Sequence, residues 1–229
     1  MTEAQALPPA RPQFDFGKPF TYVFDDPRWV HKILLGGLFF LAGFFLIGWF
    51  FLLGYVAQVT RNIIADHPRP LPEWDDLAAF FAEGARLIAV ALVYVLPFLF
   101  IVATVVIPSM ILTNVDNEGA QTVGGLMLGC LSCFLVPLGI LVMVFMPASL
   151  LFAIVEQRFN AGFEFGRIWS FITRNIGNYL LAVVIYLIAR FLGGFGMMLL
   201  CVGIIFTGFW SLLVTAHGFA QAYRLDPAR

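Results

Sequence analysis

Residues 87–113 read LIAVALVYVLPFLFIVATVVIPSMILT, an uncharged run in which almost every side chain is apolar. A helix rises 1.5 Å per residue, so about 20 residues cross the hydrocarbon core of a bilayer. The run is therefore long enough for one membrane-crossing helix. Three further apolar blocks lie at residues 29–64, 123–155 and 178–217.

The composition of the whole chain agrees with a membrane environment. Hydrophobic residues make up 61% of the 229 residues and charged residues 12%, against about 25% charged residues in soluble domains. One soluble core could not bury so much apolar surface, so the lipid bilayer is the expected partner. The net charge is −1 and there is no basic tract, which predicts no nucleic-acid partner.

The apolar blocks differ in how many helices they hold. The block 123–155 predicts one helix, whereas 178–217 predicts two, because Arg190 and Gly193–Gly196 interrupt it. The block 29–64 is either one very long helix or two short helices that turn near Gly43.

Charge placement separates these alternatives, because Lys and Arg concentrate in cytoplasmic loops. With two short helices and an internal N-terminus, twelve of the thirteen basic residues are cytoplasmic and only Arg190 is external. With one long helix, the same charges split five against eight. Two short helices are therefore predicted. The loop 114–122 contains Asp116 and Glu118 but no basic residue, as expected for an external loop.

These assignments predict an all-α integral membrane protein of six helices in three hairpins. Both termini are predicted to be cytoplasmic, in a multi-pass protein of the cell membrane. Residues 1–13 are polar and proline-bearing and lack the apolar core of a signal peptide, so we expect a flexible tail. Residues 14–226 are expected to form a single polytopic membrane domain.

A threefold internal repeat organises this domain, with units at about 14–66, 71–158 and 163–224. Each unit begins with an aromatic and charged segment, at 14–29, 71–86 and 163–175. The first and third segments share Phe-x-Phe-Gly followed by a base, which is Lys18 or Arg167. Their hairpins also end alike, in AQVTR at 57–61 and AQAYR at 220–224.

The three opening segments are predicted to be amphipathic helices at the membrane interface. In 71–86, apolar residues recur at helical spacing and Pro72 suits the first helical position. In 163–175, a similar stripe contains Phe165, Ile168, Trp169 and Ile172. The alternative is that these helices pack on the underside of the bundle, without a lipid-binding role.

Three stretches of this chain resemble a known family. They are FDDPRWVHKILLGGL at 24–38, GYVAQVTRNI at 54–63, and LPEWDDLAAFFAEGARLIAVALVYVLP at 71–97. They resemble the prokaryotic membrane-protein family catalogued as domain of unknown function 4013, with LPEWDD as the most specific piece. The resemblance extends from about Phe16 to Arg224. It implies a multi-helix membrane protein and carries over no site residues.

Polar and reactive residues give few signs of chemistry. Cys130 and Cys133 have redox-motif spacing but lie in an apolar span, which favours plain packing. His31, His67 and His217 are far apart in sequence, which does not predict a metal site. No catalytic, cofactor-binding or metal-binding residue is predicted, and no enzyme activity.

Two features of the spans are open to a functional interpretation. Pro97, Pro108, Pro137 and Pro147 are predicted to kink the two central helices, either as packing adjustments or around a substrate site. Gly125 and Gly129 match a helix-contact motif that is common by chance.

The leading hypothesis is a non-enzymatic scaffold, accessory subunit or bilayer-shaping component, with possible protein partners at the cytoplasmic face. The alternative is a small-molecule or lipid permease built on the proline-kinked central hairpin. A weaker third hypothesis is a membrane enzyme that uses Asp75, Asp76 and His67. The oligomeric state and any ligand do not follow from the sequence.

Overall fold

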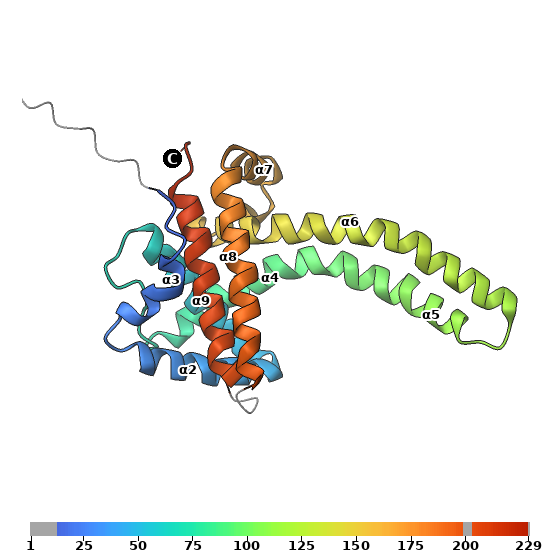
Figure 1. Cartoon of the computed structure of the whole chain (residues 1–229), viewed down its shortest axis with the longest axis horizontal. Coiled ribbons are helices and arrows are strands. Elements are labelled where there is room, and N and C mark those ends of the chain that lie inside the picture. Colours follow the sequence, from blue (N-terminus) through green and yellow to red (C-terminus); the bar gives the residue numbers. More distant parts are fainter. Residues whose placement is uncertain (1–12, 199–202, 229) are drawn as a thin grey trace, which may run out of the picture.

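The computed structural model describes residues 13–198 and 203–228, which fold into helices with no strand in this part of the chain (Figure 1). The all-helical prediction is confirmed. Of the predicted tail, residues 1–12 lie outside the described residues, as does Cys201.

The body of the protein is built around two helices that run side by side, α8 (Ile176–Phe195) and α9 (Gly203–Arg224) (Figure 1). A short 3-10 segment, η5 (Gly196–Met198), follows α8, and the two helices predicted for this block are present. Helix α9 is the most enclosed element, because α2, α3 and α8 all pack on it.

The first apolar block breaks at the predicted place. Helix α2 (Trp29–Ala42) ends before η2 (Gly43–Phe45), and α3 (Ile47–Ile64) follows. Gly36 and Gly37 let α2 touch α9, because a Cβ at either position would overlap the ring of Phe209 or Phe206. Ahead of α2, the short helices α1 (Lys18–Thr21) and η1 (Tyr22–Asp25) pack on α9 as well.

A long pair of helices extends away from the body, crosswise to α8 and α9 (Figure 1). The first member of this pair is a continuous helical stretch made of α4 (Leu77–Ile101), the π-helical η3 (Val102–Val106) and α5 (Ile107–Thr113). The second member is α6 (Glu118–Glu156). We call residues 91–147 the arm. Within the arm only Ser109 and Gly124 are buried, so its apolar side chains are at least partly exposed.

The prolines of the arm are accommodated inside its helices. Pro97 lies within α4, and Pro137 and Pro147 lie within α6. Pro108 has no N–H and its ring would crowd the carbonyl four residues earlier, so the π-helical turn just before it provides the missing space.

The predicted helix start at Pro72 is wrong. Helix α4 begins at Leu77, where Asp76 is the N-cap and accepts a hydrogen bond from the Ala79 N–H at 2.9 Å. Residues 71–76 are not helical. The third opening segment does form a separate helix, α7 (Phe165–Arg174), after η4 (Phe159–Phe163). Helix α7 buries Ile168, Phe171 and Ile172, whereas Phe165 and Trp169 are about half exposed.

Among the described residues, five helical stretches are long and apolar enough to cross a membrane: Ile47–Ile64, Leu77–Thr113, Glu118–Glu156, Ile176–Met198 and Gly203–Arg224. A sixth would require Lys18–Asp25 and Trp29–Phe45 to act as one span, although the chain bends by 110° between them. The protein is therefore a helical membrane protein.

Candidate functional site

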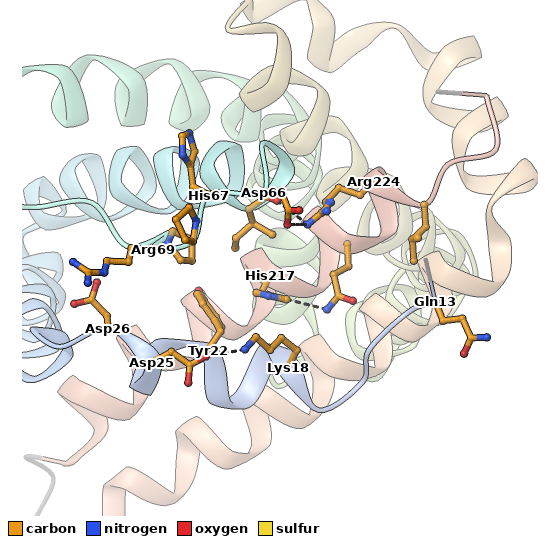
Figure 2. Close-up of a pocket in the computed structure, with 15 residues that line it drawn as sticks. Gln13, Lys18, Tyr22, Asp25, Asp26, Asp66, His67, Arg69, His217 and Arg224 are labelled. Carbon is orange, nitrogen blue, oxygen red and sulfur yellow. Dashed lines mark hydrogen bonds and ion pairs between the residues drawn. The ribbon is translucent and has the colours of Figure 1, made fainter. Parts of the chain in front are cut away.

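A polar cavity of about 500 Å³ lies at one end of the body, where α3 and α9 end and the N-terminal segment passes over them (Figure 2). We call it the basin. Its walls come from residues 13–26, from the loop 63–70 after α3, and from residues 217–225 of α9 and the C-terminal segment. Three parts of the chain that are distant in sequence therefore form one site.

The end of α3 sets one wall of the basin. Asp66 adopts a left-handed conformation with φ of 58°, and the next N–H, of His67, donates to the carbonyl of Asn62 at 2.9 Å. This arrangement satisfies the last carbonyls of the helix, and an Asp tolerates the left-handed conformation better than most residues do. Both residues line the basin, and the Asp66 side chain faces Arg224 across it (Figure 2).

Gln221 joins the two ends of the chain across the basin. Its Oε1 accepts from the Asp15 N–H at 2.9 Å, and its Nε2 donates to the Asp15 carbonyl at 3.0 Å. Because Gln221 is oriented by these bonds, its Nε2 also donates to Nδ1 of His217, at 3.0 Å. The ring hydrogen of neutral His217 is then on Nε2. The ring of His217 lies against Tyr22, with centroids 4.5 Å apart.

Most charges around the basin are paired. Lys18 Nζ lies 2.7 Å from Asp25, and Arg224 Nη1 lies 2.7 Å from Asp66. Arg69 and the ring of His67 are exposed, and no residue in the described part of the chain bonds to either side chain. The basin thus offers one unpaired guanidinium and one imidazole to a molecule from outside.

A buried charged cluster lies behind the basin. Lys32 and Asp26 are 3% and 4% exposed, and their Nζ and Oδ2 atoms lie 2.7 Å apart. The same ammonium also contacts Glu73 at 2.8 Å and donates to the Leu71 carbonyl at 2.8 Å. Burial alone raises the pKa of Asp26, but the hydrogen bonds and charges of Lys32 and Arg28 outweigh it and hold that pKa below its usual range.

The LPEW segment at 71–74 clamps α2 and α3 together. The carbonyl of Pro72 accepts a hydrogen bond from the Tyr55 hydroxyl at 3.0 Å. The Trp74 indole N–H donates to the Lys32 carbonyl at 3.2 Å, and its ring stacks on Tyr55 with centroids 4.1 Å apart. These contacts explain why residues 71–76 stay out of helix α4.

The comparison with known families agrees with this architecture. The family described as a protein of unknown function (DUF4013) matches residues 37–202, about three quarters of the chain. The chain belongs to this family. The DUF4013 match covers α3, the LPEW clamp and the arm, and confirms the resemblance seen in the sequence. A search of curated proteins and a search of solved structures each found no match.

The structure places the histidines and aspartates that were considered as possible site residues in different parts of the molecule. His67 and His217 both line the basin, whereas His31 is exposed on α2. Asp76 caps α4 and Asp75 is exposed, and neither lines the basin with His67. Within residues 13–198 and 203–228, no three His, Cys, Asp or Glu side chains come close enough to hold a metal.

The arm contains the remaining candidates. Cys130 and Cys133 are exposed rather than packed, and a Cβ added to Gly125 or Gly129 would meet open space. Pro97 borders a groove of about 560 Å³ between α4, α6 and α7, whereas Pro147 does not line it. We call it the aromatic groove, because half of its twelve lining residues are aromatic, namely Tyr94, Phe98, Phe145, Phe163, Phe165 and Trp169.

The basin was not predicted, although one signal pointed to it. The similar endings AQVTR and AQAYR contain Gln58 and Arg61 in α3, and Gln221 and Arg224 in α9. Gln58 bonds to Arg61 at 2.7 Å, whereas Gln221 and Arg224 both line the basin. Gln221 and Arg224, two polar residues near the end of an otherwise apolar helix, were therefore the sequence signal for the basin.

Proposed function

We propose that this protein is a non-enzymatic scaffold, accessory subunit or bilayer-shaping component of the cell membrane. One observation carries the proposal, namely the separation of charge from the arm. In the described part of the chain, every side chain that takes part in an ion pair belongs to residues 18–86 or to residues 156–226, outside the arm. The only charged residues of the arm are Asp116 and Glu118, which lie at its tip. Ion-coupled transporters generally need an acid or base inside the membrane.

The proposed topology places the basin and both termini in the cytoplasm. Support comes from the way basic residues gather at one end of the body. Arg224 pairs the end of α9 with Asp66 after α3, and Arg174 pairs the end of α7 with Asp226. We further propose that the three units at 14–66, 71–158 and 163–224 derive from one repeated hairpin. The similar endings of α3 and α9 support this.

Cysteine labelling tests the topology. Single cysteines replace Arg69 in the basin or Asp116 at the arm tip, in a chain whose three native cysteines are changed to serine. A membrane-impermeant maleimide added to intact cells is expected to label Asp116→Cys at once and Arg69→Cys only after lysis. Labelling of both positions from the same side would contradict the proposed topology.

Photocrosslinking tests the scaffold role. A photoreactive residue at Arg69 in the basin is compared with one at His31, which is also exposed but lies outside the basin. A partner that docks at the cytoplasmic face is expected to crosslink from position 69 in intact cells and not from position 31. Equal products from both positions, or none from position 69, would argue against docking in the basin.

The alternative is a permease, and the aromatic groove favours lipid over a polar solute as its substrate. The groove borders Pro97 but not Pro147, and its wall is almost entirely apolar, whereas a permease for polar solutes would need a polar cavity beside both prolines. Purified protein in vesicles with a fluorescent phospholipid distinguishes the two functions. Faster exchange of the phospholipid between leaflets than in protein-free vesicles would favour the permease. Unchanged exchange is the result expected for a scaffold.

A further inference from the structure

The aromatic groove has the form of a ligand site. Its volume of about 560 Å³ lies in the range of about 300–1,000 Å³ that is usual for small-molecule sites. The wall has two sides from the arm helices α4 and α6, and a third side from η4 and α7. We propose that this groove binds one acyl chain of an anionic phospholipid. The inference goes beyond the proposed function, since a scaffold or a permease could use such a site.

The polar atoms of the groove do not call for a polar ligand. The Tyr94 hydroxyl donates to the Gly162 carbonyl at 2.8 Å and accepts from Ser149 at 2.8 Å, so it is already satisfied. The other wall residues of the arm are apolar, including Val93, Phe98, Leu138 and Val142. A hydrocarbon chain loses no hydrogen bonds on entering such a groove, whereas a sugar or an amino acid would.

The groove is continuous with the lipid-facing surface of the arm. Leu141, on the groove wall, and the neighbouring Ile140 on α6 are both more than half exposed. On α7, Trp169 is 54% exposed and stacks on Phe145 with centroids 5.7 Å apart. Tryptophan favours the boundary between hydrocarbon and headgroups. A chain from the surrounding leaflet can therefore enter from the side, with its headgroup at the level of α7.

Two basic side chains, which do not line the groove themselves, contact Glu164 next to it and favour an anionic headgroup. Glu164 lies between the groove residues Phe163 and Phe165, and it contacts Arg158 and Arg167. The arginine side chains are 59% and 49% exposed, whereas Glu164 and Glu156, their acidic partners, are 36% and 15% exposed. The outer layer of this cluster is thus basic.

The arginines also keep unused hydrogen-bond donors. In the described part of the chain, the hydrogen bonds and ion pairs of Arg158 use only Nη2 and those of Arg167 use only Nη1. The Arg167 guanidinium also lies over the Phe152 ring, 4.9 Å from its centroid. A guanidinium has five N–H groups in a fork that fits a phosphate. Both arginines can therefore bind a lipid phosphate without leaving their carboxylates.

Gly166 provides a sharp test, because it lines the groove and a Cβ added there would meet no atom within 4 Å. The variant Gly166→Leu should fill the groove without disturbing the fold. Gly177→Leu is the matched control, since Gly177 also faces open space but lies on α8, away from the groove. Val142→Phe fills the groove from the opposite wall.

The measurement is native mass spectrometry of full-length protein released from detergent after incubation with phosphatidylglycerol or phosphatidylcholine. Wild type and Gly177→Leu are expected to retain one phosphatidylglycerol, and Gly166→Leu and Val142→Phe to retain at least tenfold less. Arg158→Gln should lower retention of phosphatidylglycerol several-fold and leave phosphatidylcholine unchanged. Equal retention by the groove-filling variants and wild type, or a wild type that retains no phospholipid, would overturn the inference.

A second measurement reports on the groove directly. Phosphatidylglycerol with a brominated acyl chain quenches tryptophan on contact, and the difference between wild type and Trp169→Phe isolates the signal of Trp169. This quenching should saturate at low lipid in wild type and should be lost in Val142→Phe. Quenching that rises in the same way in both proteins would show that Trp169 meets only bulk lipid.

Discussion

At the scale of single residues, the buried Lys32 is the most consequential charge in the body. Removing one partner of a buried ion pair generally costs about 3–5 kcal/mol, because the other charge is left uncompensated. We therefore expect Lys32→Met to lower the free energy of unfolding by about that amount. Thermal unfolding in detergent measures it. The double variant Lys32→Met/Asp26→Leu should recover much of the loss, and no recovery would contradict the assigned pairing.

The pair of Lys32 and Asp26 also predicts how the free energy of unfolding depends on pH. The pKa of Asp26 is lower in the folded protein than its usual value, so the unfolded chain takes up the proton first as the pH falls. The contribution of Asp26 is complete above the ordinary aspartate pKa of about 3.9 and is lost as the pH falls through the folded value. Unfolding midpoints between pH 7 and pH 3 should fall less steeply for Asp26→Asn than for wild type.

The residue scale also shows what sequence patterns could and could not predict. The helices followed from apolar runs, and the break at Gly43 followed from charge placement. The start of α4 was misplaced because Pro72 and Trp74 bond to Tyr55 and Lys32, which are distant in sequence. The basin was missed for the same reason, since its walls come from three separated segments with no local pattern.

At the scale of elements, α3 and α4 cross at two glycines. A Cβ at Gly54 would overlap the carbonyl oxygen of Phe80, and a Cβ at Gly84 would overlap that of Phe50. Backbone atoms cannot move aside as a flexible side chain can, so Gly54→Ala and Gly84→Ala should each destabilise the protein by about 1–3 kcal/mol. Thermal unfolding in detergent, with Gly177→Ala as the control in open space, tests this expectation.

The exposed apolar side chains of the arm predict that it is surrounded by lipid. Phe134 on α6 is 75% exposed and far from either end of its helix. An arginine at the centre of a membrane helix costs about 2.5–3.5 kcal/mol on insertion. We expect Phe134→Arg to reduce the membrane-inserted fraction strongly, and Asp116→Arg at the arm tip to have little effect. Normal insertion of Phe134→Arg would show that the arm does not lie in lipid.

At the scale of the whole molecule, the arm and the body differ in length and direction. The uncharged run 87–113 is about 40 Å long as a helix, against a hydrocarbon thickness of about 30 Å. Helix α8, with 20 residues, matches that thickness more closely. Because the arm runs crosswise to α8 and α9, the two cannot both stand upright in one flat bilayer (Figure 1).

We therefore expect the arm to lie tilted, by about 40° from the bilayer normal if the whole run 87–113 stays within the hydrocarbon. Spin labels placed along α4 and α5 measure the depth of each position. Depth should change by about 1.1 Å per residue, rather than the 1.5 Å of an upright helix. A slope near 1.5 Å per residue would show that the body adapts its orientation to an upright arm.

The two hydrogen bonds between Gln221 and the backbone of Asp15 have a consequence for biosynthesis. The first helices pack on α9, which is made after them, whereas the two halves of the arm pack mainly on each other. During translation the arm can form before α9 is made, but α1, α2 and α3 must wait for α9 before their inner faces are covered. A chain that stops before residue 203 would leave those faces open, and the cell's quality-control proteases would find its beginning, rather than its end, exposed.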